Sequence, residues 1–267
     1  MFRILAAVLV VLAAAVPAMA RAPDSVFIED LTWTELAGAI AAGKTTIIIP
    51  VGGVEQSGPY MALGKHDARA RILAERIARS LGDALVAPVV AYVPEGEIDP
   101  PTQHMKFPGT ITTPQAAFRA MLASAAGSFR KHGFRDIVLI GDHGGYQSDL
   151  KAAADAVNKG WAGSPARVHY IADYYRITQT AYVAALKARG YSAAEIGTHA
   201  GLADTSLTLA VAPNLVRAEG LKSGPPAGAK EGVYGDPRHS SAALGEIGIE
   251  QIVRETTQAI RAAVKRP

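Results

Sequence analysis

Histidine and acidic side chains recur where buried strands are expected to end. Glu55 lies in the Gly-rich stretch 50–59 after an apolar run, and His143 lies in Gly141–Gly145 after a second run. Alone, such a carboxylate is more often a turn residue and such a histidine a structural hydrogen-bonding group. Other loop-like positions add His66, His104, His199 and Asp204. Together they predict a metal centre, because imidazole and carboxylate ligands suit Zn²⁺ or Mn²⁺.

The chemistry expected of this centre is hydrolysis, since a divalent ion polarises a carbonyl and lowers the pKa of bound water. The chain has no cysteine, which excludes thiolate nucleophiles, iron–sulfur clusters and cysteine-ligated zinc. Any metal must therefore be held by His, Asp and Glu. The formal net charge is +3, from 27 basic and 24 acidic residues. The basic residues are scattered, so we expect no nucleic-acid partner.

Short apolar runs alternate with longer stretches of helical periodicity, a pattern typical of a parallel sheet between two helix layers. Ligands of such sheets bind beyond the carboxyl ends of the strands, where both motifs lie. The proline-rich stretch 94–114 predicts a long loop or lid, in which Glu95 and Glu97 are interpreted as solvated. Strands are predicted at 45–51, 84–93, 136–141 and 167–172, and helices at 68–81, 115–131, 148–159, 177–189, 202–211 and 243–264.

Residues 1–20 predict a cleaved secretory signal peptide. Arg3 precedes the apolar run Ile4–Val16, and Ala18–Ala20 forms a small-x-small cleavage signature. An uncleaved anchor is the alternative, although the run is shorter than the roughly 20 apolar residues that span a bilayer. We therefore expect a single periplasmic domain over residues 21–267, with no membrane segment after cleavage. The lack of cysteine suits an oxidising compartment.

Five motifs, in order along the chain, resemble those of the creatininase family of metal-dependent amidohydrolases. The stretch 50–67 resembles the opening motif, approximately P-x-G-x-x-E-Q-H-G-P-H-L-P-x-x-x-D. The segments His104–Thr110, Ile140–Gly145, His199–Ser206 and Gly235–Pro237 resemble H-x-x-F-P-G-T, N-G-H-G-G-N, H-A-G-x-x-E-T-S and G-D-P. The resemblance implies an α/β fold, a three-layer α/β/α sandwich with a mostly parallel central sheet. It also implies a divalent-metal centre, usually of two ions, and a homo-oligomer, often a hexamer.

The same resemblance assigns roles to individual residues. Glu55 and His143 match metal ligands, and Asp204 matches a carboxylate ligand as Asp in place of Glu. His199 matches a histidine that donates or accepts a proton near the substrate. Glu55 is a second candidate catalytic residue, because Glu55, or alternatively Asp204, can take the proton of a metal-bound water if the metal leaves it free.

Departures from the family pattern define a divergent, exported subgroup. Ser57 and Tyr60 stand where the family has histidines, and Tyr146 stands where an asparagine follows the two glycines. These three residues are interpreted as substrate contacts. His104 is interpreted as a fourth contact or as an anchor of its loop.

When the opening motif is aligned without a gap, the position of the family's bridging aspartate is taken by His66. Asp67, one residue later, is the alternative. We prefer His66 as the ligand, because imidazole commonly binds such metals. A neutral imidazole offers one metal-binding nitrogen, so it cannot bridge two ions as a carboxylate does. We therefore predict one ion held by Glu55, His66, His143 and Asp204; two ions in an altered arrangement is the alternative.

Two functions follow from these residues. The first is a Zn²⁺- or Mn²⁺-dependent amidohydrolase that hydrolyses a small cyclic or linear amide, with one or two ions per chain. The second is a non-catalytic exported protein that binds a metal or a small molecule on a degenerate fold. The retention of both ligand and proton-transfer side chains favours the enzyme.

Overall fold

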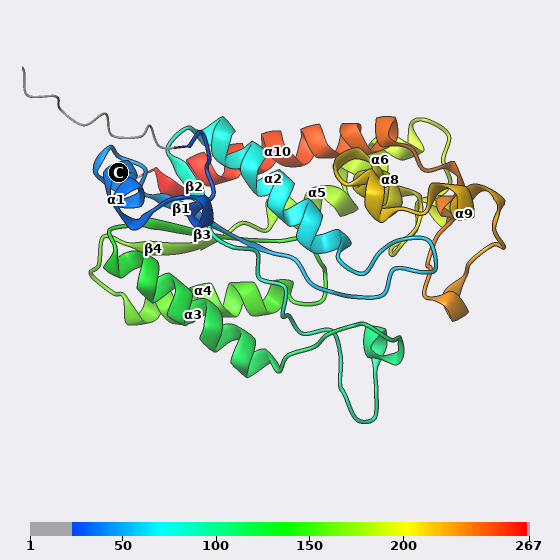
Figure 1. The fold of residues 1–267 in the computed structure, drawn as a ribbon, viewed down its shortest axis with the longest axis horizontal. Helices are drawn as coiled ribbons and strands as arrows, with labels where there is room; N and C mark the ends of the chain where they lie inside the picture. Colours follow the sequence, from blue (N-terminus) through cyan, green and yellow to red (C-terminus); the bar gives the residue numbers. More distant parts are fainter. Residues whose placement is uncertain (1–22, 266–267) are drawn as a thin grey trace, which may run out of the picture.

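Four parallel strands form the central sheet of the computed structural model, which describes residues 23–265 (Figure 1). The predicted signal peptide, residues 1–20, lies outside the described residues. The order across the sheet is β2-β1-β3-β4. The strands are β1 (Thr46–Val51), β2 (Ala84–Val86), β3 (Asp136–Gly141) and β4 (Arg167–Tyr170).

The register of the two central strands brings the two motifs together. β1 and β3 pair along their whole length, so that Val51 lies opposite Gly141 at their carboxyl ends. All residues of both strands are buried, as expected for a parallel sheet that is covered on both faces. Glu55 and His143, which follow these two strands, therefore start from neighbouring points on one edge of the sheet.

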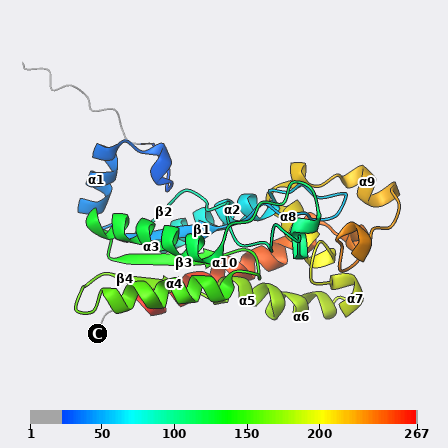
Figure 2. The ribbon, with the colours of Figure 1, turned by 90° about the horizontal axis from the view of Figure 1, so that it is seen from below.

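Alternate residues of β1 face two separate helix layers (Figures 1 and 2). Ile48 packs in one hydrophobic cluster, whose helices are α2 (Lys65–Leu81), α5 (Asp173–Gln179), α8 (Leu202–Val211) and α10 (Ala242–Val264). Ile47 and Ile49 pack in the other, whose helices are α1 (Trp33–Ala41), α3 (Gln115–Lys131) and α4 (Gln147–Gly160). This arrangement confirms the predicted three-layer α/β/α fold.

Shorter elements gather at the end of the molecule opposite α1 (Figure 2). Figure 2 shows α6 (Ala181–Lys187), α7 (Ala193–Ile196) and α9 (Ala218–Ser223) at that end, beside α8. The proline-rich loop contains a short 3-10 helix, Gln103–Lys106. Other 3-10 segments are Ile28–Asp30, Pro213–Leu215, Ala229–Glu231 and Pro237–His239. Among residues 23–265, no helix combines the length and apolar character needed to cross a bilayer.

The structure corrects two predicted elements. The strand predicted over 84–93 ends at Val86, and only an isolated bridge between Val51 and Val90 continues it, since Pro88 cannot donate to a ladder. The helix predicted over 177–189 is two helices, because the backbone turns at Thr180 with φ −122° and ψ −86°.

Two helix starts also differ from the sequence prediction. α1 was not predicted; it has no buried residue, and a capping box between Thr32 and Glu35 begins it. α2 begins at Lys65 rather than at residue 68. This earlier start places Lys65 and His66 on the first turn of α2, where both side chains are buried.

Candidate functional site

Glu55 is fully buried, and its two carboxylate oxygens have different surroundings. Oε1 lies 2.6 Å from His66 Nε2 and 3.4 Å from Lys65 Nζ. Oε2 faces His104 Nε2 at 3.2 Å and His143 Nε2 at 3.4 Å, and it accepts no hydrogen bond from any described residue. Burial would raise the pKa of Glu55, but the positive charge of Lys65 and the neighbouring His143 and His66 together outweigh burial and hold this pKa well below its usual value.

Four side chains around Glu55 Oε2 form what we call the ligand cluster: Glu55, Glu95, His104 and His143. One ligand atom from each lies within 4.8 Å of all the others. Glu95 is 1% exposed, and within residues 23–265 neither of its oxygens has a hydrogen-bond partner. Buried carboxylate oxygens without partners are costly unless a cation compensates them. With two imidazoles beside them, these oxygens fit a divalent cation such as Zn²⁺ or Mn²⁺.

Two glycines leave the space in which Glu95 enters this cluster. Gly53 has φ +136°, and a Cβ there would lie 2.9 Å from Glu95 Oε1. A Cβ on Gly52 would lie 2.7 Å from the Cα of Asp67 at the start of α2. The loop after β1 can therefore pack directly on α2 only with glycine at position 52, and beside Glu95 only with glycine at position 53. Glu95, which the sequence prediction placed in solvent, is thereby buried against the loop.

The two histidines of the ligand cluster are in the protonation state that binds metal. Burial lowers the pKa of His143 to about 4 and also lowers the pKa of His104. Both imidazoles are therefore neutral at neutral pH, which is the form that binds metal. Burial, and then the negative charge of Glu55, raise the pKa of Glu95 to about 9. Without a cation Glu95 holds a proton, and a bound cation would favour its carboxylate.

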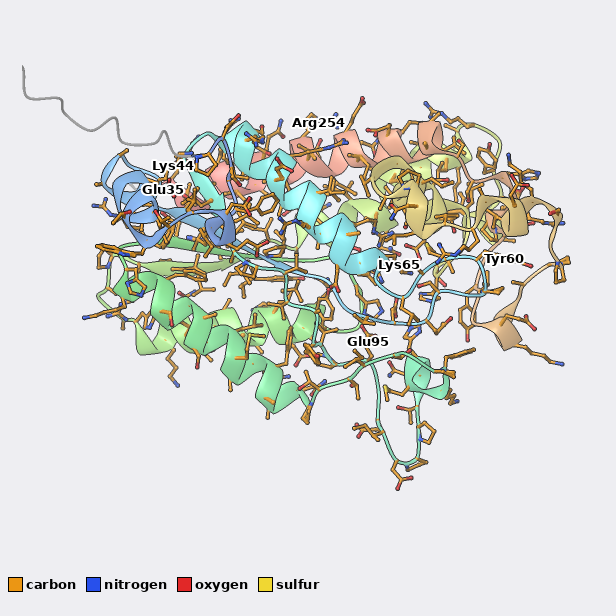
Figure 3. The ribbon with its side chains drawn as sticks, in the orientation of Figure 1. Glu35, Lys44, Tyr60, Lys65, Glu95 and Arg254 are labelled. Atoms are coloured by element: carbon orange, nitrogen blue, oxygen red, sulfur yellow. The ribbon has the colours of Figure 1, made fainter. Side chains whose placement is uncertain are left out.

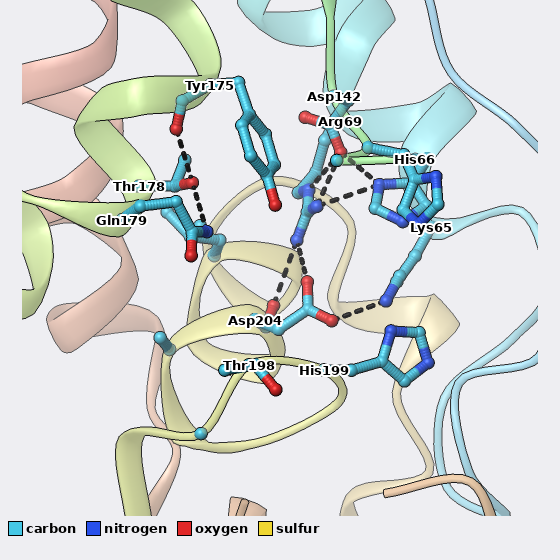
Figure 4. Close-up of a pocket in the computed structure, with 15 residues that line it drawn as sticks. Lys65, His66, Arg69, Asp142, Tyr175, Thr178, Gln179, Thr198, His199 and Asp204 are labelled. Atoms are coloured by element: carbon cyan, nitrogen blue, oxygen red, sulfur yellow. Dashed lines mark hydrogen bonds and ion pairs between the residues drawn. The ribbon is translucent and has the colours of Figure 1, made fainter. Parts of the chain in front are cut away.

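A second group of buried charges adjoins the ligand cluster, and we call it the ion-paired cluster: Lys65, His66, Arg69, Asp142 and Asp204 (Figure 4). Lys65 Nζ donates to Asp204 Oδ2 at 2.5 Å, and Arg69 pairs with both Asp142 and Asp204. His66 Nδ1 lies 2.5 Å from Asp142 Oδ1. Lys65 and His66 lie four and three residues before Arg69, so each is a neighbour of Arg69 on the surface of α2.

Two of the predicted metal ligands belong to this second cluster. Both nitrogens of His66 are engaged, one by Glu55 and the other by Asp142. Asp204 pairs with Lys65 and Arg69, and its Oδ2 also accepts the backbone N–H of Ala200 at 2.9 Å. Asp67, the alternative to His66, accepts instead from Gly53 N at 2.8 Å. The structure thus places Glu55 and His143 in the ligand cluster, and His66 and Asp204 outside it.

His199 lies between the two clusters. Its Nε2 is 2.9 Å from the carbonyl oxygen of Gln56, which accepts when Nε2 is protonated, and its Nδ1 is 3.6 Å from Glu55 Oε1. Burial, and then the charge of Lys65, lower the pKa of His199 to about 3. Its Nδ1 is therefore an unprotonated nitrogen beside the ligand cluster. The following residue, Ala200, has φ +52°, a costly backbone conformation that the Asp204 hydrogen bond supports.

A small polar cavity opens beside both clusters. Its volume is about 100 Å³. Charged and polar side chains line most of it, including Lys65, His143, Tyr175, Thr178, His199 and Asp204. This cavity has room for a small polar molecule next to His143 and His199.

Three predicted substrate contacts lie away from this cavity. Tyr146 is fully buried; its hydroxyl lies 2.8 Å from the carbonyl of Val51, to which it can donate, and accepts the N–H of His143 at 3.0 Å. Tyr60 donates to the carbonyl of Pro225 and lies toward α9, whereas Lys65 and Glu95 lie near the middle of the molecule (Figure 3). Ser57 is buried in a separate cavity beside Tyr60. Of the four predicted contacts, His104 alone is in the ligand cluster.

Sequence comparisons relate the chain to known hydrolases. The family profile described as creatinine amidohydrolase matches residues 29–260. Creatinine amidohydrolase of Pseudomonas putida is 28% identical over 206 residues, which cover 76% of this chain and 78% of that protein. A mycofactocin precursor peptide peptidase of Mycolicibacterium smegmatis is 29% identical over 221 residues, covering 75% of this chain and 78% of the relative.

Solved structures agree with this assignment. A creatininase described as the Mn form matches with a TM-score of 0.77 and 25% identity, covering 91% of this chain and all of that chain. A variant creatininase described as the Zn–Zn type matches with a TM-score of 0.75 at the same identity and coverage. The metals in these descriptions, together with the ligand cluster, support a divalent metal in this chain.

Proposed function

Because the chain belongs to the creatininase family, we propose that it is a metal-dependent amidohydrolase that hydrolyses a small cyclic or linear amide at the ligand cluster. One observation carries the proposal. Three carboxylate oxygens, Glu55 Oε2 and both oxygens of Glu95, are buried without a hydrogen-bond partner among residues 23–265, beside two neutral imidazoles. An unpartnered set of this kind serves no structural purpose that the described contacts reveal, and it has the donor atoms that Zn²⁺ and Mn²⁺ prefer.

The proposed mechanism divides the work among the residues of the site. Glu55, Glu95, His104 and His143 would hold the ion, which when bound polarises the amide carbonyl and lowers the pKa of water. His199 presents its unprotonated Nδ1 toward the ligand cluster, so it can take a proton and deliver it to the departing nitrogen. The polar cavity beside it limits the substrate to a small amide.

We also propose that this activity takes place in the periplasm. Residues 1–20 carry the pattern of a secretory signal peptide, which supports export to the periplasm. The relatives act on different substrates by name, creatinine in one case and a precursor peptide in another. Family membership therefore supports amide hydrolysis in general, and the substrate of this chain is a small amide whose identity a substrate panel must establish. We further propose that the chain works as a homo-oligomer.

The test uses the purified protein with added Zn²⁺ or Mn²⁺ and a panel of lactams, formyl amides and acyl amides. We expect turnover of at least one class. In His199→Ala we expect turnover to fall by about 10²- to 10⁴-fold, the usual contribution of a proton-transfer group, with metal content unchanged. His239→Ala is the matched control, because the His239 side chain is 64% exposed.

Two outcomes would count against the proposal. Full activity in His199→Ala would remove His199 from the mechanism. Inactivity toward every amide, together with tight binding of a small molecule, would instead favour the non-catalytic binding protein.

A further inference from the structure

Lys65 is a lysine with a fully buried side chain at the boundary of the two clusters. Lysine is almost never fully buried unless it is paired. Its Nζ lies 2.5 Å from Asp204 Oδ2 and 3.4 Å from Glu55 Oε1 (Figure 4 shows the Asp204 contact). The ammonium thus occupies a point between two carboxylates, where a cation is required if both are to stay ionised.

We infer that the Lys65 ammonium is a fixed cation that restricts this site to one divalent ion. The inference rests on the proposed function, because it assumes that the ligand cluster binds a metal. It adds that Lys65 occupies the position at which a second metal ion would otherwise bind, and that it acts as a positioning residue for Glu55.

The two oxygens of the Glu55 carboxylate have different partners. Its Oε1 is engaged by His66 and Lys65, whereas its Oε2 has no hydrogen-bond partner in the described part of the chain. Only Oε2 is therefore free for a metal. A carboxylate with one free oxygen cannot bridge two ions with one oxygen on each.

The Lys65 ammonium is surrounded by atoms that could bind a metal. Two potential ligand atoms contact the ammonium, Glu55 Oε1 and Asp204 Oδ2, and a third, His199 Nδ1, lies 3.6 Å from Glu55 Oε1. Two carboxylate oxygens and an imidazole nitrogen form a ligand set that suits Zn²⁺ or Mn²⁺. The ammonium makes this set unavailable, since it satisfies both carboxylates and repels a second cation.

Removal of the ammonium should therefore create a second metal site. The test removes all metal with a chelator and then dialyses each protein against Mn²⁺. It compares wild type with Lys65→Ala and with the double variant Lys65→Ala/Asp204→Ala. Bound manganese per chain is then measured by elemental mass spectrometry. We expect one ion in wild type, two in Lys65→Ala and one in the double variant. Lys151→Ala, which removes an exposed lysine paired with Asp155, is the matched control and should bind one ion.

Each other outcome has a distinct meaning. Two ions in wild type, or one ion in folded Lys65→Ala, would overturn the inference about Lys65. No ion in wild type would instead overturn the metal centre of the proposed function. Circular dichroism verifies folding, and if Lys65→Ala does not fold, Lys65→Gln takes its place. Glutamine keeps a polar contact to Asp204 without the charge, so two ions are expected and one ion would overturn the inference.

Discussion

The ligand cluster and the ion-paired cluster are adjacent groups of buried ionisable side chains, and they differ in whether those side chains have partners of opposite charge. In the ion-paired cluster, Asp142 and Asp204 each have cationic partners. In the ligand cluster, the oxygens of Glu95 and one oxygen of Glu55 have no hydrogen-bond partner within the described residues. A buried charge without a partner destabilises a fold, whereas a satisfied pair holds elements together. The comparison teaches that the ion-paired cluster stabilises the site, whereas the ligand cluster is arranged to bind a ligand.

The largest effect is expected at Arg69. Arg69→Leu leaves Asp142 and Asp204 buried without their guanidinium, so the free energy of unfolding should fall by about 3–5 kcal/mol. Urea unfolding followed by circular dichroism measures this change. Arg254→Leu breaks an exposed pair with Glu255 and should cost no more than about 1 kcal/mol. A similar small loss in Arg69→Leu would show that the ion-paired cluster does not stabilise the fold.

The second largest effect is expected at Glu95 of the ligand cluster. Glu95→Gln removes a proposed ligand, and even residues that only support ligands change metal affinity by about 10- to 100-fold. We therefore expect Mn²⁺ affinity to fall by more than about 100-fold in titration calorimetry. The stability of the metal-free protein should not fall, because the lost carboxyl group has no hydrogen bond to a described residue. Glu97→Gln, an exposed change in the same loop, is the control. Equal affinity in both variants would exclude Glu95 from the centre.

The smallest effect concerns Tyr146, which joins the two strand ends. Tyr146→Phe removes a buried hydroxyl that bonds to the backbone near Val51 and His143, so we expect a loss of about 1–3 kcal/mol in stability. The KM for the substrate should stay unchanged, because Tyr146 does not line the cavity. Tyr92→Phe, at a tyrosine that is 65% exposed, is the control. A raised KM without a loss of stability would restore Tyr146 as a substrate contact.

Much of the fold was predictable from the sequence, because periodicity reflects burial. Strands 136–141 and helices 115–131 and 202–211 have the predicted limits. Glu55 and His143 were also predictable, since residues that follow parallel strands meet at one edge of the sheet. α1 was not predicted; it is only nine residues long and has no buried residue.

The partition of the site between two clusters was not predictable. Residue type marks His66 and Asp204 as metal ligands, but in the structure His66 contacts Asp142 and Glu55, and Asp204 contacts side chains of α2. These contacts depend on tertiary packing. Glu95 lies in a loop whose prolines suggest exposure, and only the space at Gly53 reveals its burial. Lys65 gave no signal at all, because a lysine in sequence is almost always a solvated residue.

Glu55 belongs to the ligand cluster and also contacts Lys65 and His66 of the ion-paired cluster, so this carboxylate couples metal supply to the lifetime of the protein. An ion that binds the folded chain but not the unfolded chain stabilises it by RT ln(1 + [ion]/Kd), which is about 2.7 kcal/mol at 100 times Kd. In the metal-free protein the buried oxygens of Glu55 and Glu95 lack that compensation. Metal-starved molecules should therefore unfold and be degraded first, so that the surviving population is enriched in loaded protein.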